Sequence, residues 1–84
     1  MFYMYILKSL SNSRAYIGCT SDLRKRVVEH NTRQERSTKA GFPWKLIYYE
    51  AFSSISFARQ REAKLKRYGK RWSELKKRIG FDSA

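Results

Sequence analysis

Apolar and polar positions near the start of the chain predict a β-hairpin. From Phe2 to Leu7 nearly every residue is aromatic, β-branched or long and apolar, as expected of a strand whose two faces are both covered. The small polar residues of LSNSR interrupt this run, and AYIGCT then resumes in β character. We therefore predict strands over residues 2–9 and 14–20, joined by a tight turn.

After the hairpin the pattern changes to the period of a helix. Thr20 or Ser21 is suited to cap this helix, because a hydroxyl side chain can accept a backbone hydrogen bond from its first turn. A narrow stripe at positions i, i+4 and i+8 is predicted to face inward, and it holds Leu23, Val27 and Asn31.

The second half of the chain predicts one more strand and two more helices. Gly41 and Pro43 interrupt the chain before WKLIYYEAF, whose aromatic and aliphatic residues favour a strand over residues 44–52. A helix ending at Gly69 and a last helix before Gly80 follow. Their apolar positions are Phe57, Ala58, Leu65 and Tyr68 in the first, and Trp72, Leu75 and Ile79 in the second.

The predicted order of elements is therefore β, β, α, β, α, α. This order favours the α+β class, with a small three-stranded antiparallel sheet flanked by helices. The sequence contains no internal repeat, linker or low-complexity segment. We therefore expect a single domain over residues 1–84.

Composition separates the chain from disordered proteins and points to its partner. Of the 84 residues, 42% are hydrophobic and 15% aromatic, enough for a compact core. Nineteen Lys and Arg against seven Asp and Glu give a formal net charge of +12. Such an excess indicates a polyanionic partner such as nucleic acid, the alternative being a merely basic soluble protein. So short a chain is not expected to enclose a deep substrate cavity.

The chain has one cysteine and one histidine, Cys19 and His30. A single cysteine forms no intramolecular disulfide, and the pair cannot complete a tetrahedral zinc site without carboxylates or a second chain. The apolar N-terminus lacks a basic region and a cleavage site, and no apolar run is long enough to span a membrane. We therefore expect a reduced, cytoplasmic protein without a membrane association.

Arg26 and His30 stand at i and i+4 of the first predicted helix, so they project from neighbouring turns of one face. That face lies beside the inward stripe, which places both groups at the edge of the core. A guanidinium there can bind a phosphate through two hydrogen bonds, and an imidazole can shuttle a proton near neutral pH. The alternative is an ordinary solvated face with His30 hydrogen-bonded locally.

Glu62 lies on the flank of the apolar stripe of the second predicted helix. Four cations bracket it in the sequence, namely Arg59, Arg61, Lys64 and Lys66. One interpretation is a simple ion pair with one of them. The other is a metal ligand, because one carboxylate with substrate phosphate oxygens and waters is a usual way to hold Mg²⁺.

Six tyrosines is a high count for this length, and most are interpreted as core or base-stacking aromatics. Five lie in the predicted strands: Tyr3, Tyr5, Tyr16, Tyr48 and Tyr49. On the second strand Tyr16 and Gly18 share one face. Ile17 and Cys19 share the other, and we interpret Cys19 as a small buried hydrophobe rather than a reactive thiol.

Taken in order, FYMYIL, YIG, DLRKRVVEHN, PWKLIYYE and QREAKLK resemble the elements of a GIY-YIG nuclease domain over most of the chain. The resemblance is strongest to the small stand-alone bacterial members, which are related to the N-terminal incision domain of the excinuclease of excision repair. It implies a phosphodiesterase with one divalent ion. The chain departs from the pattern at Tyr3-Met4-Tyr5, at Cys19 where the repair subgroup has a lysine, and in having no asparagine after Glu62.

The resemblance also implies roles for particular residues. The tyrosines matching Tyr5 and Tyr16 line the site, and one of them positions or deprotonates the attacking water. The arginine matching Arg26 clamps the scissile phosphate, and the residue matching His30 assists proton movement. The glutamate matching Glu62 holds the metal, Mg²⁺ or alternatively Mn²⁺.

The sequence and the resemblance together predict a metal-dependent endonuclease that cuts DNA selectively by structure, in repair or recombination. We expect a monomer or weak homodimer. The alternatives are a nucleic-acid-binding module of the same fold with weak or no catalysis, and a basic docking surface for protein. The residues expected to contact nucleic acid are Arg14, Lys25, Lys39, Arg59, Arg61 and Lys66.

Overall fold

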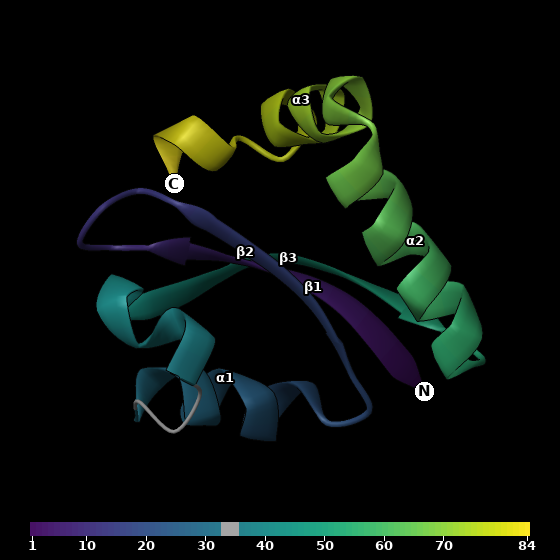
Figure 1. Cartoon of the computed structure of the whole chain (residues 1–84), viewed down its shortest axis with the longest axis horizontal. Coiled ribbons are helices and arrows are strands. Elements are labelled where there is room, and N and C mark those ends of the chain that lie inside the picture. Colours follow the sequence, from purple (N-terminus) through teal and green to yellow (C-terminus); the bar gives the residue numbers. More distant parts are fainter. Residues whose placement is uncertain (33–35) are drawn as a thin grey trace.

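A computed structural model describes residues 1–32 and 36–84 of the chain (Figure 1). Within these residues the strands are β1 (Phe2–Ser9), β2 (Ala15–Thr20) and β3 (Trp44–Phe52). The α-helices are α1 (Leu23–Asn31), α2 (Ile55–Arg67) and α3 (Gly69–Arg78), with short 3₁₀ helices at Arg36–Gly41 and Phe81–Ser83. The predicted α+β class and the order of elements are confirmed.

The sheet has the order β2-β1-β3, and both pairs of strands are antiparallel. Its central strand β1 is buried from Met4 to Ser9, which explains the nearly continuous apolar run in the sequence. The register sets Tyr5 opposite Gly18 on β2 and Tyr49 on β3. The strand at the centre of the sheet therefore presents side chains to helices on both sides.

One face of the sheet packs against α2 and α3, and the other against α1 (Figure 1). The face toward α2 and α3 carries the larger apolar cluster, built from Met4, Ile6, Ile17, Leu65, Leu75 and Phe81. The α1 face carries a smaller cluster of Tyr5, Leu7 and Trp44, with half-buried Leu23 and Val27 from the helix. The predicted inward stripe of the first helix is confirmed.

The Asn31 side chain fastens the end of α1 to the start of β3. Its Oδ1 accepts the Trp44 backbone N–H at 2.6 Å, and its Nδ2 donates to the Trp44 carbonyl at 2.8 Å. Both backbone groups of Trp44 are thereby satisfied where the strand begins. Asn31, the third residue of the predicted stripe, therefore links α1 to β3 through hydrogen bonds.

The ends of the helices differ from the prediction at several points. Asp22, not Thr20 or Ser21, caps α1, and its Oδ1 accepts the Lys25 N–H at 3.1 Å. The Thr20 hydroxyl instead accepts the Asp22 N–H at 3.1 Å. A carboxylate one residue further along replaces the expected hydroxyl because the chain leaves β2 through one more extended residue.

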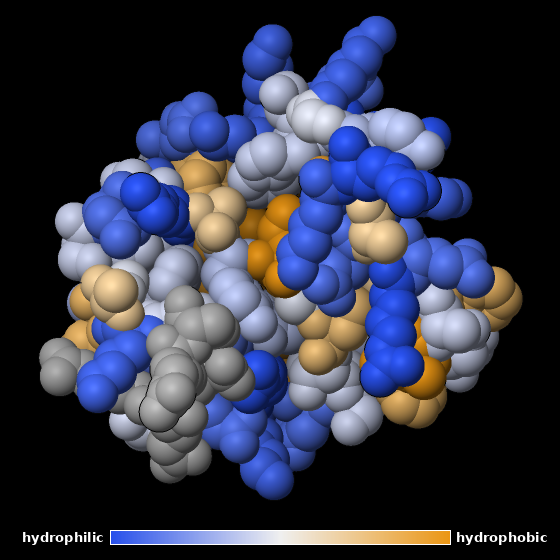
Figure 2. Space-filling view, in the orientation of Figure 1, coloured by the Kyte–Doolittle hydropathy of each residue, from blue (hydrophilic) through white to orange (hydrophobic). Residues whose placement is uncertain are grey.

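The junction of α2 and α3 also differs, because Gly69 begins α3 and does not end α2 in a left-handed conformation. The extended Tyr68 breaks the helix, and Gly80 is the glycine with a positive φ, 67°. Phe57 and Tyr68 were expected to mark the apolar stripe and are instead exposed. Figure 2 shows hydrophilic side chains projecting over α2 and α3 with small apolar patches between them.

Among the helices of the described residues, none combines the length and apolar character that crossing a bilayer requires.

Candidate functional site

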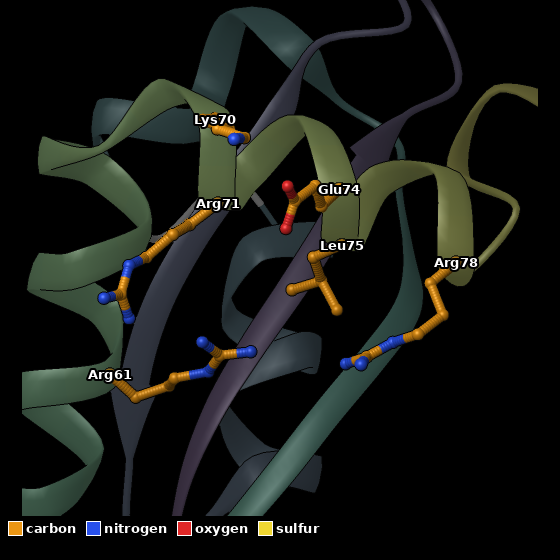
Figure 3. A pocket seen from close by; sticks show the side chains of 6 residues that line it. All are labelled: Arg61, Lys70, Arg71, Glu74, Leu75 and Arg78. Carbon is orange, nitrogen blue, oxygen red and sulfur yellow. The ribbon is translucent and has the colours of Figure 1, made fainter.

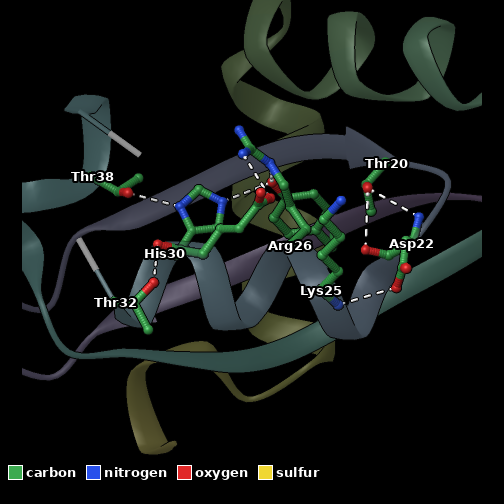
Figure 4. A network of polar contacts seen from close by, with 9 residues as sticks. Thr20, Asp22, Lys25, Arg26, His30, Thr32 and Thr38 are labelled. Carbon is green, nitrogen blue, oxygen red and sulfur yellow. Dashed lines mark hydrogen bonds and ion pairs between the residues drawn. The ribbon is translucent and has the colours of Figure 1, made fainter. Parts of the chain in front are cut away.

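A buried chain of polar side chains links β1, α1 and the 3₁₀ helix before β3. The Tyr5 hydroxyl lies 2.9 Å from Nε2 of His30, and Nδ1 of the same ring lies 2.7 Å from Oγ1 of Thr38. Arg26 Nε donates to the Tyr5 hydroxyl at 3.3 Å. Because a guanidinium can only donate, the Tyr5 hydroxyl accepts from Arg26, and its own proton is available to Nε2, an arrangement that goes with the ring proton on Nδ1. Figure 4 shows the His30 ring and its contact with Thr38.

Gly18 of the YIG sequence makes room for the Tyr5 hydroxyl. The two residues are paired across β1 and β2, and both are buried. A Cβ at position 18 would lie 2.7 Å from the hydroxyl oxygen of Tyr5 and 3.0 Å from the ring of Tyr16. Only a residue without a side chain permits this approach, so the glycine places both phenols.

His30 is fully buried, which corrects the expectation that it stands at the edge of the core. The spacing on α1 allows either a solvated face with His30 hydrogen-bonded locally or an imidazole that shuttles a proton. A solvated face does not describe the imidazole, because its two nitrogens contact Tyr5 and Thr38 inside the protein. The ring is therefore placed to orient the Tyr5 hydroxyl.

Arg26 remains partly exposed, with 26% of its side chain accessible, and Nη1 lies 3.4 Å from Glu29. It reaches from the buried Tyr5 hydroxyl to the surface of α1. Of the two side chains predicted at i and i+4, the guanidinium alone stands where a phosphate can contact it.

Tyr16 lies between the buried chain and solvent. Its ring is half-buried, with its centroid 4.8 Å from that of His30, 6.2 Å from Tyr5 and 6.3 Å from Trp44. No side chain or backbone group of the described residues hydrogen-bonds its hydroxyl. Tyr16 is thus the more accessible of the two phenols in the cluster.

Burial raises the pKa of Tyr5 above its ordinary value, and the nearby Tyr16 and Glu62 add to this effect. The hydrogen bond and charge of Arg26 act in the opposite direction and do not overcome burial. Arg26 thus lowers the pKa of Tyr5, but by less than burial raises it. This phenol stays protonated near neutral pH and serves as a hydrogen-bond donor.

Glu62 on α2 meets the opposite face of β2. Its Oε1 accepts a hydrogen bond from the Cys19 thiol at 2.9 Å, and its Oε2 is paired with the Lys66 ammonium. The simple ion pair proposed from the sequence is therefore present. The carboxylate is half-buried, and its charge lies close enough to Tyr5 to raise the pKa of that phenol.

Cys19 packs against the larger apolar cluster, as expected of a small hydrophobe, and its thiol also acts as a donor. Burial, followed by the hydrogen bond to Glu62, raises the pKa of Cys19 to about 12. The thiol thus stays protonated. At the position where the repair subgroup has a lysine, this chain has Cys19, whose neutral thiol hydrogen-bonds to Glu62.

The residues around Glu62 fit a metal only as a one-carboxylate site. Within residues 1–32 and 36–84 no three His, Cys, Asp or Glu side chains gather as a metal-binding group. Mg²⁺ commonly binds through one or two carboxylates and completes its shell with waters and substrate phosphate oxygens. The half-buried Glu62 carboxylate suits that arrangement, with Lys66 as the competing cation.

The cations predicted to bind nucleic acid fall into two groups. Four are exposed: Arg14, Lys25, Lys39 and Arg59. The other two are engaged in ion pairs, Arg61 with Glu50 of β3 and Lys66 with Glu62. The structure distributes these cations over several elements and does not bring them together as one group.

Thr38 is the site residue that the sequence analysis missed. It is buried, its Oγ1 contacts His30, and its carbonyl accepts the Trp44 indole N–H at 2.7 Å. The segment RSTKAGFP reads only as an interruption between elements. The residue of this segment that could have indicated a packed loop is Gly41. A Cβ at position 41 would collide with the Trp44 ring, so glycine is needed for the loop to pack there.

The fold is a small α+β domain that gathers an arginine and two tyrosines on the α1 face of its sheet. The model of the GIY-YIG catalytic domain family matches residues 1–79, and the chain belongs to this family. It is a family of nucleases.

Curated relatives and a solved structure agree with this assignment. The chain is 44% identical over 66 residues to a UPF0213 protein of Streptococcus pneumoniae serotype 4, covering 77% of this chain and 66% of that one, just under two thirds. A UPF0213 protein of Streptococcus agalactiae is 42% identical over 65 residues, covering 76% and 73%. The solution NMR structure of a UPF0213 protein from Bacillus halodurans has a TM-score of 0.54 at 28% identity, covering 89% and 81%.

Proposed function

We propose that this protein is a divalent-metal-dependent endonuclease that hydrolyses phosphodiester bonds in DNA, selects branched or otherwise irregular structures, and acts in repair or recombination in the cytoplasm. The observation that carries the proposal is the position of Arg26. Its guanidinium contacts the buried Tyr5 hydroxyl, its side chain is 26% exposed, and the half-buried Tyr16 ring lies 6.2 Å from the ring of Tyr5. A phosphate at this surface would meet a cation and a phenol at once.

Arg26 is assigned to the scissile phosphate. A guanidinium offers parallel N–H groups that match two phosphate oxygens. The contact from Nε to Tyr5 fixes the side chain at its inner end, and the exposed pair with Glu29 is weak enough to be replaced. The negative charge that develops on the phosphate during hydrolysis would be stabilised here.

Tyr16 is assigned to the attacking water, and Tyr5 to holding the site in shape. The Tyr16 hydroxyl has no hydrogen-bond partner among the described residues and lies on the accessible side of the cluster. Burial raises the pKa of Tyr5, so its phenol keeps its proton, donates a hydrogen bond to His30 and is not suited to act as a base. His30 and Thr38 then set the orientation of that phenol.

Glu62 is assigned to the metal, Mg²⁺ or Mn²⁺, together with substrate oxygens and waters. When bound, such an ion supplies Lewis-acid polarisation of a phosphoryl oxygen. The chain's own contribution is to hold the carboxylate: the Cys19 thiol fixes Oε1, and the Lys66 ammonium neutralises Oε2 until substrate arrives.

Cleavage assays with two matched arginines of α1 test this proposal. Purified protein with Mg²⁺ or Mn²⁺ is expected to cut flap, branched or single-stranded DNA, and Arg26→Ala to lower the rate about 10³-fold or more. Glu62→Gln is expected to abolish the metal-dependent rate. Arg24→Ala, which removes an exposed arginine of the same helix, serves as the control and should keep the rate. Wild-type activity in Arg26→Ala would refute the assignment.

A second candidate is a nucleic-acid-binding module of the same fold that does not cleave. Two observations favour it: Cys19 supplies a neutral thiol where the resemblance has a cation, and Lys66 occupies the Glu62 carboxylate. Salt-dependent DNA binding without cleavage under any divalent metal would establish this candidate in place of the first.

A further inference from the structure

A hollow between α2 and α3 lies on the face of the sheet away from α1. Its volume is about 640 Å³, and it is lined by Arg61, Lys70, Arg71, Glu74, Leu75 and Arg78 (Figure 3). Leu75 belongs to the apolar cluster of the α2 and α3 face, whereas Tyr5 belongs to the cluster of the α1 face. The hollow is therefore separate from the Tyr5, Tyr16 and Arg26 cluster.

The lining of the hollow is strongly basic. Within the described residues no carboxylate is paired with Lys70, Arg71 or Arg78, and Arg71 stacks over Tyr68 at 5.5 Å. Glu74 is the acidic side chain of the lining. Glu50 balances the charge of Arg61, and Glu74 balances one of the three cations Lys70, Arg71 and Arg78. Two positive charges remain in excess, and they favour an anion inside the hollow.

One wall of the hollow is held rigid by an ion pair with two hydrogen bonds. Arg61 donates from Nε and Nη2 to the two oxygens of Glu50, at 2.9 and 3.1 Å, and Tyr48 donates to Glu50 at 2.7 Å. Burial alone would raise the pKa of Glu50, but these hydrogen bonds and the charge of Arg78 lower it. Figure 3 shows the guanidinium groups of Arg61 and Arg78 turned toward one another from α2 and α3.

A second, smaller hollow continues from the first. It measures about 300 Å³, shares Arg61 and Arg71, and adds Lys64, Phe52 and Phe57. Phe57 is 53% exposed, so its ring is accessible to a stacked base. Cations beside an exposed aromatic ring are the features by which proteins hold single-stranded nucleic acid, through phosphates and a stacked base.

We propose that the two hollows form a binding site for a single-stranded segment of nucleic acid, with backbone phosphates at Arg71 and at Arg78 and a base on Phe57. This proposal depends on the proposed function only in taking nucleic acid as the substrate, and it does not require that the nucleic acid is cleaved. α2 joins the two sites, because Arg61 reaches Glu50 on β3 while its neighbour Glu62 reaches Cys19 on β2. The segment held here would be one that flanks the cleaved bond.

Binding measurements without divalent metal test this site apart from cleavage. Fluorescence anisotropy with a single-stranded oligonucleotide of about 15 nucleotides is compared for two triple variants that remove one lysine and two arginines each. The test variant carries Lys70→Ala, Arg71→Ala and Arg78→Ala. The control carries Arg24→Ala, Arg67→Ala and Lys77→Ala, all exposed and outside both hollows.

The test variant is expected to bind about tenfold more weakly at fixed salt, and its salt slope to fall by about 2. The control should lose about threefold or less, since general charge alone contributes there. Phe57→Ala is expected to weaken single-stranded binding about tenfold and duplex binding little. Equal losses in the two triple variants, or no loss in the test variant, would overturn the proposal.

Inorganic phosphate distinguishes a nucleic-acid site from a free-phosphate site. In NMR titrations the oligonucleotide should shift amides at Lys70, Arg71 and Phe57, whereas phosphate alone should leave Phe57 unchanged. Saturation of the basic residues by phosphate, with no further shift from the oligonucleotide, would refute the nucleic-acid ligand. If Arg26→Ala still cleaves while the triple variant binds weakly, the proposed catalytic role fails and this site stands.

Discussion

The two faces of the sheet bury very different side chains, although both are built from the same strands. Side chains alternate along β1, so Met4 and Ile6 join the apolar cluster under α2 and α3, while Tyr5 and Leu7 point to α1. The first face is closed by aliphatic and aromatic packing. The second contains the chain from Tyr5 through His30 to Thr38.

The difference indicates that one face supplies most of the apolar stabilisation, whereas the other fixes the geometry around Tyr5. Apolar burial stabilises in proportion to the area removed from water, which is the contribution of the α2 and α3 face. A buried polar chain contributes little net stability but holds its members in one geometry, provided that every member is hydrogen-bonded. Among the described residues no buried side-chain nitrogen or oxygen lacks a hydrogen-bond partner.

Phe81→Ala should give the largest loss of stability without touching the α1 face. Phe81 is 1% exposed and its ring packs edge-on against Trp72. We expect the free energy of unfolding to fall by about 3–5 kcal/mol. Denaturant unfolding measures it, with Leu10→Ala, at a side chain 59% exposed, as the control. A loss of cleavage beyond the loss of folded protein would break the division between the faces.

Gly18→Ala should disturb the α1 face through sterics alone. The new Cβ would lie 2.7 Å from the Tyr5 hydroxyl, and the buried ring cannot move without displacing its neighbours. We expect a cost of roughly 1–3 kcal/mol in unfolding free energy, together with loss of cleavage.

Gly69→Ala is the matched control for the glycine at position 18. A Cβ added at position 69 would have no atom within 4 Å, so the alanine fits without a clash. The free energy of unfolding should stay the same or rise slightly, because alanine favours a helix. If both alanine variants behave alike, close packing around Tyr5 is not the reason for the glycine.

Thr38→Val should show whether the polar chain orients Tyr5. The substitution keeps the shape and removes the hydroxyl that contacts Nδ1 of His30, at a cost of about 1–2 kcal/mol. The ¹⁵N signals of the His30 ring should report a changed tautomer balance, and cleavage should fall. Thr38→Ser, which restores a hydroxyl, should recover both; unchanged ring signals in the valine variant would contradict the assignment.

Acid should weaken one polar contact of the α2 and α3 face by a smaller amount. The pKa of Glu50 is lowered in the folded protein, so its pair with Arg61 contributes fully above the ordinary value of 4.5. Below that pH the unfolded chain takes up a proton first, and the contribution is lost as pH falls through the folded pKa. The free energies of unfolding of the wild type and of Glu50→Gln, measured with denaturant, should differ by about 1 kcal/mol at pH 7 and by less at pH 3. If the two free energies of unfolding differ as much at pH 3 as at pH 7, the ion pair of Glu50 with Arg61 is not the cause of the difference.

Much of the fold could be predicted from the sequence because its signals are local. β1 and β2 agree with the predicted strands to within one residue, and β3 matches residues 44–52. The helix ends were less predictable. Whether Asp22 or Ser21 caps α1 depends on where the chain leaves the sheet, which no single residue type decides.

Most residues of the candidate site could be predicted from the sequence, but Thr38 and the surroundings of these residues could not. Arg26 and His30 were found from their helical spacing, and the YIG sequence supplied Tyr16. That spacing equally allowed a solvated face, because it says nothing of what α1 packs against. The burial of His30 depends on Tyr5, 25 residues earlier in the chain, and on Thr38 in a segment without a regular pattern.

The sequence by itself determined the period of each element, the excess of positive charge and the residues that identify the family, since these depend on neighbours along the chain. Tertiary structure alone decided which phenol is buried, that Cys19 meets Glu62 across 43 positions, and that α2 and α3 enclose a basic hollow. Such contacts join distant residues, and burial in turn sets which of them can ionise or reach a ligand.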